Sequence, residues 1–352
     1  FWFNHFNVHQ YKANLRVMVG DYEQGLRERS LGRFRDLLGY TAHHPAMLRY
    51  LDNEQNAAGR INENYARELL ELHTLGIGGG YSQRDVQELA RVLTGLGVNL
   101  SDTPPKLKPA QAAQYRRDGL TEFNPARHDF GDKTLLGITV AGRGYAELDQ
   151  VLDLLAVHPS TARFVSRKLA QYFVADEPPP ALVARMAERW QQTDGRIAEV
   201  LRTMITSAEF EASLGRKFKD PTHYVVSAVR LAYADKVVLN TGPMIGWLYR
   251  LGQAPYNRQT PDGYPLDENA WAGPGQMTTR FEIARAIGSG SAGLFKAEGE
   301  KQDRPAFPQL ANPLYYDGIA PRLAAATKSA LAQATSPQEW NTLLLASPEL
   351  MN

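Results

Sequence analysis

The chain has 352 residues, with 39 Lys and Arg residues against 38 Asp and Glu residues and no cysteine. This length allows a sizeable core in one large domain or in two packed ones. The near-neutral charge and the lack of a long basic run argue against nucleic-acid binding, and no apolar stretch approaches the roughly 18 residues that span a bilayer. The absence of cysteine excludes disulfides, thiolate zinc sites and cysteine nucleophiles, and it suits an exported protein.

Helical periodicity dominates the first hundred residues. Apolar residues at spacings of three and four predict a helical segment over residues 31–52. Further helices are expected over residues 62–75 and 83–94. Ser82 and Asp85 form a predicted capping box at the start of the last of these.

The rest of the chain alternates between irregular and helical segments. Residues 101–145 lack helical period, and the run TLLGITV within them predicts a short strand or hairpin. Helical patterns return over residues 145–174, 180–215 and 220–234, separated by proline and glycine. Residues 252–275 are rich in Gly, Pro, Tyr and Asn and predict a long loop, which is either functional or a mobile connection.

These patterns together predict an all-α fold, mainly α-helical with long irregular loops and one short hairpin. We expect a single helical domain over residues 1–352. The alternative division has lobes 1–100 and 146–352, joined by the irregular segment 101–145. That alternative follows from the place where helical periodicity breaks.

The charged residues of NENYARELLELHTLG, which begins at Asn62, gather on one side of the predicted helix. At about 100° per residue, an arc of about 140° holds Glu63, Arg67, Glu68 and Glu71. A solvated helix face explains this pattern, because i,i+4 pairs of opposite charge stabilise helices. If further protein covers the arc, the carboxylates instead line a cleft, where Arg67 keeps its neighbours ionised and a more buried glutamate gains a raised pKa.

Two residues of the irregular segment are further candidates. His128 and Asp129 belong to FNPARHDFGD, and loop residues on a helical scaffold commonly carry function. The alternative is that Asp129 caps a turn and that His128 bonds a backbone carbonyl. Imidazole and carboxylate groups also suit a divalent metal, with His5, His128 and Glu68 or Glu71 as ligands. No spacing requires a metal, so no cofactor is expected.

Substrate-binding candidates come from three parts of the chain. Trp2 and His5 lie in the opening motif FWFNHF, and Arg67 lies on the charged arc. Tyr264 and Trp271 lie in the long loop, where aromatic rings could stack on sugar rings. Aromatic residues near prolines also form small packing clusters, which is the alternative for these two.

A set of motifs recurs in order along most of the chain: FWFNHFNV, DYEQGLRERSLGRFRDLL, HPAMLRYLD, NENYARELLELHTLGIGGGYSQRDVQELARVLTG, FNPARHDFGDKTLLG, HPSTARFVSRKLAQYFVADEPP and TPDGYPLDENAW. In this the chain resembles the domain of unknown function 1800 family of bacterial proteins. The resemblance implies a mostly helical, usually exported protein, with a family-typical helical part before Phe1. It also implies a partner family resembling sulfatases and alkaline phosphatases. It supplies no reaction.

The leading hypothesis is a periplasmic or extracellular hydrolase of an envelope polymer, with a polysaccharide as the preferred substrate. A carboxylate of the arc acts as general acid or base, Arg67 tunes it, and His128 with Asp129 approaches from the irregular segment. The competing hypothesis is a non-catalytic envelope protein that binds a polymer or a sulfatase-like partner through its loops. The burial of the arc glutamates distinguishes the two hypotheses, because an active site requires these glutamates to be at least half covered, with His128 nearby.

Overall fold

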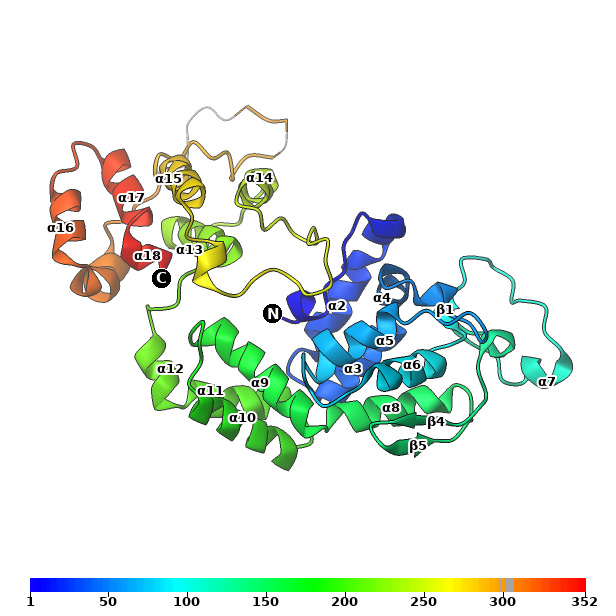
Figure 1. Cartoon of the computed structure of the whole chain (residues 1–352). Helices are drawn as coiled ribbons and strands as arrows, with labels where there is room; N and C mark the ends of the chain where they lie inside the picture. The colour runs from blue at the N-terminus through cyan, green and yellow to red at the C-terminus, as the bar shows by residue number, and fades with distance from the viewer. Residues whose placement is uncertain (298, 302–306) are drawn as a thin grey trace. The chain divides into compact units, whose positions relative to one another are not determined.

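The computed structural model describes residues 1–297, 299–301 and 307–352. The chain divides into two compact units, which Figure 1 draws from blue to red along the chain: unit 1 contains Phe1–Ala212 and Tyr256–Tyr264, and unit 2 contains Ser213–Pro255 and Pro265–Asn352. The irregular segment 101–145 lies wholly within unit 1 and so does not separate the units. The single-domain expectation stays a prediction.

Unit 1 consists mainly of helices around one apolar core. Its α-helices are α1 (Trp2–His5), α2 (Val19–Arg29), α3 (Phe34–His43), α4 (Pro45–Tyr50), α5 (Asn64–Glu68), α6 (Gln83–Val92), α7 (Pro109–Ala112), α8 (Ala146–Ala156), α9 (Pro159–Phe173), α10 (Pro180–Gln192), α11 (Ile197–Ile205) and α12 (Ala208–Ser213), the last of which ends at the unit boundary. Shorter or wider helical turns are η1 (Lys12–Val17), η2 (Asn53–Gln55), η3 (Leu69–Thr74) and η4 (Pro125–Arg127). Fully buried Phe6, Phe34 and Trp190 belong to the core.

Two small antiparallel sheets also belong to unit 1. The first has the order β1 (Leu96–Val98), β3 (Thr121–Phe123) and β2 (Arg116–Asp118). The second pairs β4 (Lys133–Leu135) with β5 (Ile138–Val140), which confirms the hairpin predicted over TLLGITV. The all-α prediction is therefore corrected: the protein is mainly helical, with small sheets. Strands of three residues are too short to give a clear alternating pattern in the sequence.

Unit 2 is helical and has its own apolar core. Its elements are α13 (Pro221–Tyr233), α14 (Gly242–Arg250), η5 (Glu268–Ala270), α15 (Pro274–Gly288), η6 (Tyr315–Ile319), η7 (Ala320–Arg322), α16 (Ala325–Ala332), α17 (Pro337–Leu345) and α18 (Pro348–Met351). Fully buried Tyr224, Ile283 and Leu344 belong to this core. Across both units, none of the helices described combines the length and the apolar character needed to cross a membrane.

Helix starts follow from local side-chain chemistry. The capping box of Ser82 and Asp85 is confirmed, and the Asp220 side chain caps α13 by accepting from a backbone N–H. Two other helices start at His–Pro pairs, where Nδ1 of His44 and of His158 accepts a backbone N–H at 3.1 Å.

The turn after the 62–75 segment depends on a glycine. Gly76 has a φ of +82°, which side chains rarely adopt, and a Cβ at this position would lie 2.6 Å from Cδ2 of Phe164 on α9. The glycine therefore allows both the left-handed turn and the close approach of α9 to η3.

Replacing Gly76 by alanine should lower the free energy of unfolding by about 2–4 kcal/mol, because a strained φ and a steric overlap add together. Gly78→Ala is the matched control, since Gly78 has a φ of +72° but open space around its Cα. The control should lose only about 1 kcal/mol. Urea unfolding of both variants measures the difference, and equal losses would contradict the packing role of Phe164.

Candidate functional site

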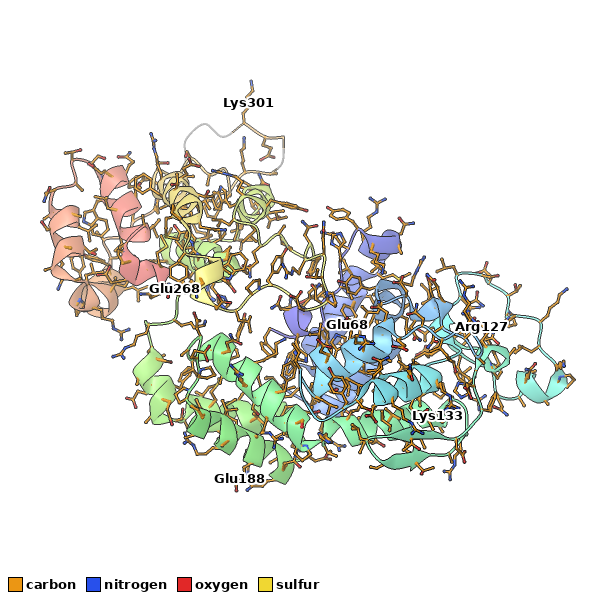
Figure 2. All side chains as sticks on the ribbon, in the orientation of Figure 1. Glu68, Arg127, Lys133, Glu188, Glu268 and Lys301 are labelled. Carbon is orange, nitrogen blue, oxygen red and sulfur yellow. The ribbon has the colours of Figure 1, made fainter. Side chains whose placement is uncertain are left out.

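The glutamates of the predicted arc lie just before α5, at its end and in the helical turn that follows it. α5 (Asn64–Glu68) is followed at once by η3 (Leu69–Thr74), a π-helical turn. Its wider hydrogen bonding includes Leu75 N donating to Leu70 O at 2.8 Å, five residues back. Such π-turns are frequent at functional sites. Figure 2 labels Glu68 at the end of α5, where the two turns meet.

The start of α6 and the glycine-rich turn before it cover two of the three glutamates. Glu63 accepts from Arg67 Nη2 at 3.0 Å and from Gln83 Nε2 at 2.7 Å. Glu71 accepts from the Tyr81 hydroxyl at 3.2 Å. These glutamates are half-buried, and the side chain of Glu63 is 31% exposed. The arc is therefore neither a free solvent face nor a closed cleft.

The segment Tyr256–Tyr264, distant in sequence, is tied to the beginning of the chain. Asn7 Nδ2 donates to the carbonyl oxygens of Arg258 and Thr260 at 3.0 and 2.9 Å. The Tyr50 hydroxyl donates to the carbonyl of Gln259 at 2.9 Å. These bonds involve backbone groups, so they fix the path of the segment rather than a single side chain.

Asn4 fixes the end of the same segment from both sides. Its Nδ2 donates to Tyr264 O at 2.9 Å and its Oδ1 accepts from Tyr264 N at 2.6 Å. Gly263 has a φ of +79°, and a Cβ there would lie 2.1 Å from Asn4 O. The glycine of the PDGYP motif is thus required by close backbone contact.

Asp262 occupies the turn that these bonds hold. Partial burial would raise the pKa of Asp262, but hydrogen bonds from Thr260 and Arg258 outweigh that effect and keep the pKa below its ordinary value. The side chain is 52% exposed. Asp262 is therefore an ionised carboxylate that water can reach.

Glu68 has the opposite environment. Burial raises its pKa, the negative charges of Glu71 and Asp262 raise it further, and Arg67 opposes them. Among the residues that the structure describes, the Glu68 carboxyl has no hydrogen-bond donor. Two neighbouring carboxyl groups therefore have pKa values shifted apart, which is the usual condition for separate acid and base roles.

Sequence reasoning missed Asp262 although it examined the segment around it. The residue stands in TPDGYPLDENAW, inside the long loop that was predicted to be functional or mobile. Its position depends on the contacts that Asn4, Asn7 and Tyr50 make with the Tyr256–Tyr264 segment. No local sequence pattern predicts these long-range contacts. The loop composition was the one available signal.

His128 and Asp129 are engaged elsewhere in unit 1. His128 is buried, with Nδ1 2.7 Å from Thr94 O and Nε2 3.0 Å from Glu147 Oε1. Arg91 binds Asp129 through Nε and Nη2 and, with further hydrogen bonding, holds the pKa of Asp129 at about 2. The His128 ring thus lies against a backbone carbonyl, and Asp129 Oδ1 also accepts from Gly131 N at 2.9 Å within a turn, as the alternative interpretation expected. No described hydrogen bond or ion pair joins either of them to the glutamate arc.

The predicted substrate-binding residues lie in different environments. Trp2 is buried among aromatic rings and donates to Ser30 O at 2.9 Å. His5 is buried too, with Nε2 3.1 Å from His73 O. Tyr264 is half-buried at the end of the tied segment. Trp271 belongs to unit 2, where its Nε1 donates to Pro265 O at 3.0 Å.

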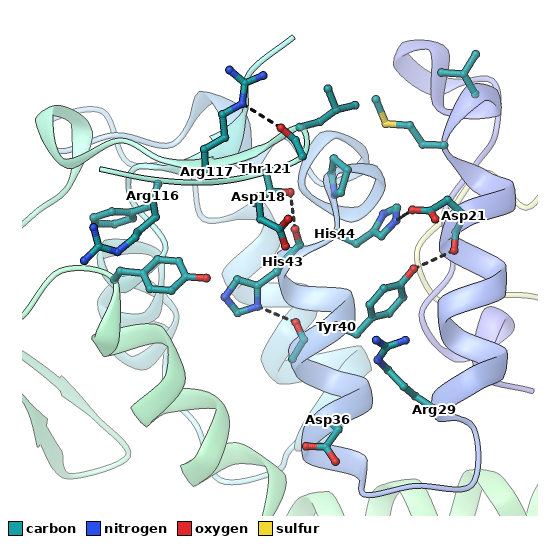
Figure 3. A pocket seen from close by; sticks show the side chains of 18 residues that line it. Asp21, Arg29, Asp36, Tyr40, His43, His44, Arg116, Arg117, Asp118 and Thr121 are labelled. Carbon is teal, nitrogen blue, oxygen red and sulfur yellow. Dashed lines mark hydrogen bonds and ion pairs between the residues drawn. The ribbon is translucent and has the colours of Figure 1, made fainter. Parts of the chain in front are cut away.

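A separate pocket of about 830 Å³ lies in unit 1 between α2, α3 and the β2–β3 hairpin (Figure 3). Its charged lining is balanced: Arg29, Arg116, Arg117, Asp21, Asp36 and Asp118. His44 Nε2 already bonds Asp21 at 3.0 Å, and Thr121 Oγ1 donates to His43 O at 2.7 Å. Its lining includes none of the candidates above, and Glu68 and Asp262 remain the candidate site.

Comparison with known proteins gives the family but no reaction. A family model described as "Protein of unknown function (DUF1800)" matches residues 1–352. The chain belongs to the DUF1800 family. No curated protein and no solved structure matches this DUF1800 chain. Within the described part of the chain, no group of three or more His, Asp or Glu side chains is arranged to hold a metal ion.

The tie between Asn7 and the Tyr256–Tyr264 segment is testable. Asn7→Ala removes two hydrogen bonds to the backbone and should increase local opening of the segment. Trypsin should then cut the native protein after Arg258 at least about tenfold faster, since each bond contributes roughly 1 kcal/mol. Asn99→Ala, which alters an amide in the β1–β2 connection, is the control and should leave this rate unchanged. Equal cutting of all three proteins would contradict the tie.

The buried contact between Lys133 and Glu147 gives a stability prediction. Lys133 Nζ lies 2.6 Å from Glu147 Oε2 and both side chains are fully buried; Figure 2 labels Lys133 on β4. Lys133→Met should lower the free energy of unfolding by about 3–5 kcal/mol, because it leaves a buried carboxylate short of a partner. Lys106→Met, at an exposed site, should change it by less than about 0.5 kcal/mol. A loss below about 1 kcal/mol for Lys133→Met would contradict this account.

The same contact sets a pH dependence. Burial would raise the pKa of Glu147, but hydrogen bonds from His128 and Lys133 outweigh it and lower the pKa. The stabilisation is therefore present above the ordinary pKa of glutamate and is lost as the pH falls through the lowered value. Acid unfolding of the wild type should be steeper than that of Lys133→Met.

Proposed function

We propose that this DUF1800 protein is a hydrolase of an envelope or extracellular polymer, with a polysaccharide as its substrate. The observation that supports the proposal is the pair Glu68 and Asp262, whose pKa values are shifted in opposite directions by their surroundings. Two carboxyl groups with contrasting protonation are what glycoside hydrolysis requires. The lack of cysteine is consistent with action outside the cytoplasm.

In this proposal Glu68 is the general acid. Its proton passes to the glycosidic oxygen as the bond to the anomeric carbon breaks, so the leaving sugar departs as a neutral alcohol. Asp262, ionised and open to water, takes a proton from the water molecule that adds to the anomeric carbon. One water is consumed, and a later proton transfer returns Glu68 and Asp262 to their starting states.

The other charged residues of the arc have supporting roles. Arg67 binds Glu63 and Gln83, so it holds the start of α6 against α5. Glu71 adds negative charge beside Glu68 and thereby favours its protonated form. Neither role requires contact with the substrate. His128 and Asp129, which the sequence hypothesis expected beside the arc, have other partners, so the proposal gives their place to Asp262.

A turnover assay on a panel of bacterial and plant glycans tests the proposal. Glu68→Gln and Asp262→Asn should each lower turnover by about 100-fold or more, as expected for removal of a general acid or base. Glu28→Gln, at an exposed position of α2, is the control and should retain activity. Absence of turnover on every glycan would contradict the proposal and favour a non-catalytic polymer-binding or partner-binding protein. Unchanged turnover in both variants would contradict the assignment.

The pH profile provides a second test. Activity should fall as the pH rises through the raised pKa of Glu68, because the acid loses its proton. It should also fall as the pH drops through the lowered pKa of Asp262, because the base becomes protonated. Asp262→Asn should abolish the acidic limb of the residual activity, and an unchanged acidic limb would contradict the role of Asp262.

A further inference from the structure

Lys168 lies on α9, which packs against η3, and it interacts electrostatically with Asp262 of the proposed site. It follows Phe164 by four residues, so both side chains are on one face of the helix. Phe164 makes the close contact with Gly76 at the end of η3, and Lys168 Nζ lies 5.6 Å from the centre of the Phe164 ring. The lysine is half-buried.

The ammonium group of Lys168 has no hydrogen-bond or ion-pair partner among the residues that the structure describes. The two other lysines of unit 1 that are buried or half-buried differ: Lys133 is paired with Glu147, and Lys12 lies 2.8 Å from Asp52. A cation that is partly withdrawn from water without a partner is unfavourable. Such a group is relieved when a ligand supplies the missing anion.

The charged and titratable groups around Lys168 come from three other elements. Burial lowers the pKa of His5 on α1, and burial lowers the pKa of His73 on η3 to about 3, so both rings are neutral at neutral pH. Asp262 on the tied segment is ionised. Burial lowers the pKa of Lys168 itself to about 8, although Asp262 opposes the shift, so the amine is mostly protonated at pH 7.

The rest of the site is acidic. Glu71 and Asp262 lie around Glu68, so an anionic polymer would be repelled there unless a cation compensated. The arginines of this region are already engaged, with Arg67 bound to Glu63 and Arg258 bound to Asp262. Lys168 is the neighbouring cation that remains available in the described structure.

We propose that Lys168 forms an anion-binding subsite that selects polymers carrying a negatively charged substituent, such as the carboxylate of a uronic acid. The proposal rests on the proposed function for the location of the substrate. It adds the class of substrate: an acidic rather than a neutral polysaccharide. A sulfate ester offers the same chemistry, and the experiment distinguishes the two sources.

Titration calorimetry tests the subsite by binding alone. The wild type is titrated at pH 7 with three oligosaccharides of equal length: oligogalacturonate, sulfated dextran oligomers and unmodified dextran oligomers. We expect at least one acidic oligomer to bind about tenfold to a hundredfold more tightly than the neutral one, as a charge-assisted hydrogen bond allows. The acidic oligomer that binds identifies the source of the anion.

Lys168→Met keeps the aliphatic stem against Phe164 and removes the charge. It should reduce binding of the acidic oligomer to the level of the neutral one. Lys236→Met is the matched control, because Lys236 Nζ also lies over a phenylalanine ring, 5.8 Å from the centre of Phe295, but is exposed and belongs to unit 2. The control should bind as the wild type does.

The wild-type protein gives an independent measurement that needs no variant. Affinity for the acidic oligomer should fall as the pH rises from 7 to 9, because Lys168 loses its proton while Asp262 stays ionised and both histidines stay neutral. Equal affinity for acidic and neutral oligomers, or acidic binding unchanged in Lys168→Met, would overturn the subsite. Glu68→Gln separates the two proposals: it should lower turnover by about 100-fold or more, while acidic binding and its dependence on Lys168 remain.

Discussion

The proposed site depends on the hydrogen bonds that tie Tyr256–Tyr264 to the beginning of the chain. Asn4, Asn7 and Tyr50 bind backbone groups of that segment, and Gly263 allows the close contact. Without these bonds, Asp262 would have no fixed position beside α5. A charged helix face alone is a common feature of helical proteins, whereas a carboxylate from a distant segment that interacts electrostatically with it is not given by helical periodicity.

Glutamates that look equivalent in the sequence have different hydrogen-bond partners in the structure. Glu63 is bound by Arg67 and Gln83, and Glu71 is bound by Tyr81, so both are held in place. Glu68 has no such donor in the part of the chain that the structure describes, and it is partly buried beside other negative charges. Desolvation and like charge then act in the same direction and raise its pKa. The same physical reasoning underlies the proposed role of Lys168, a half-buried cation without an ion-pair partner among the described residues.

Local patterns predicted what local interactions determine. The helices predicted between residues 31 and 234, the capping box of Ser82 and the hairpin over TLLGITV follow from spacing and turn chemistry. The π-turn of η3 was not predicted, because a helical wheel at 100° per residue assumes α-helical geometry, and a π-turn contains an extra residue. The burial of His128 against Glu147 and the approach of Asp262 also escaped prediction, since both require long-range contacts that no single segment encodes. The family match covers residues 1–352 and gives no reaction.

The most direct test of this account is the pKa of the Glu68 side chain, measured by carbon-13 NMR of labelled glutamate carboxyl groups. Comparison with Glu68→Gln assigns the resonance. We predict that Glu68 titrates above the ordinary range of glutamate, and that its pKa falls in Asp262→Asn because a neighbouring negative charge is lost. A Glu68 resonance that titrates like an exposed glutamate, and that Asp262→Asn leaves unchanged, would contradict the central claim.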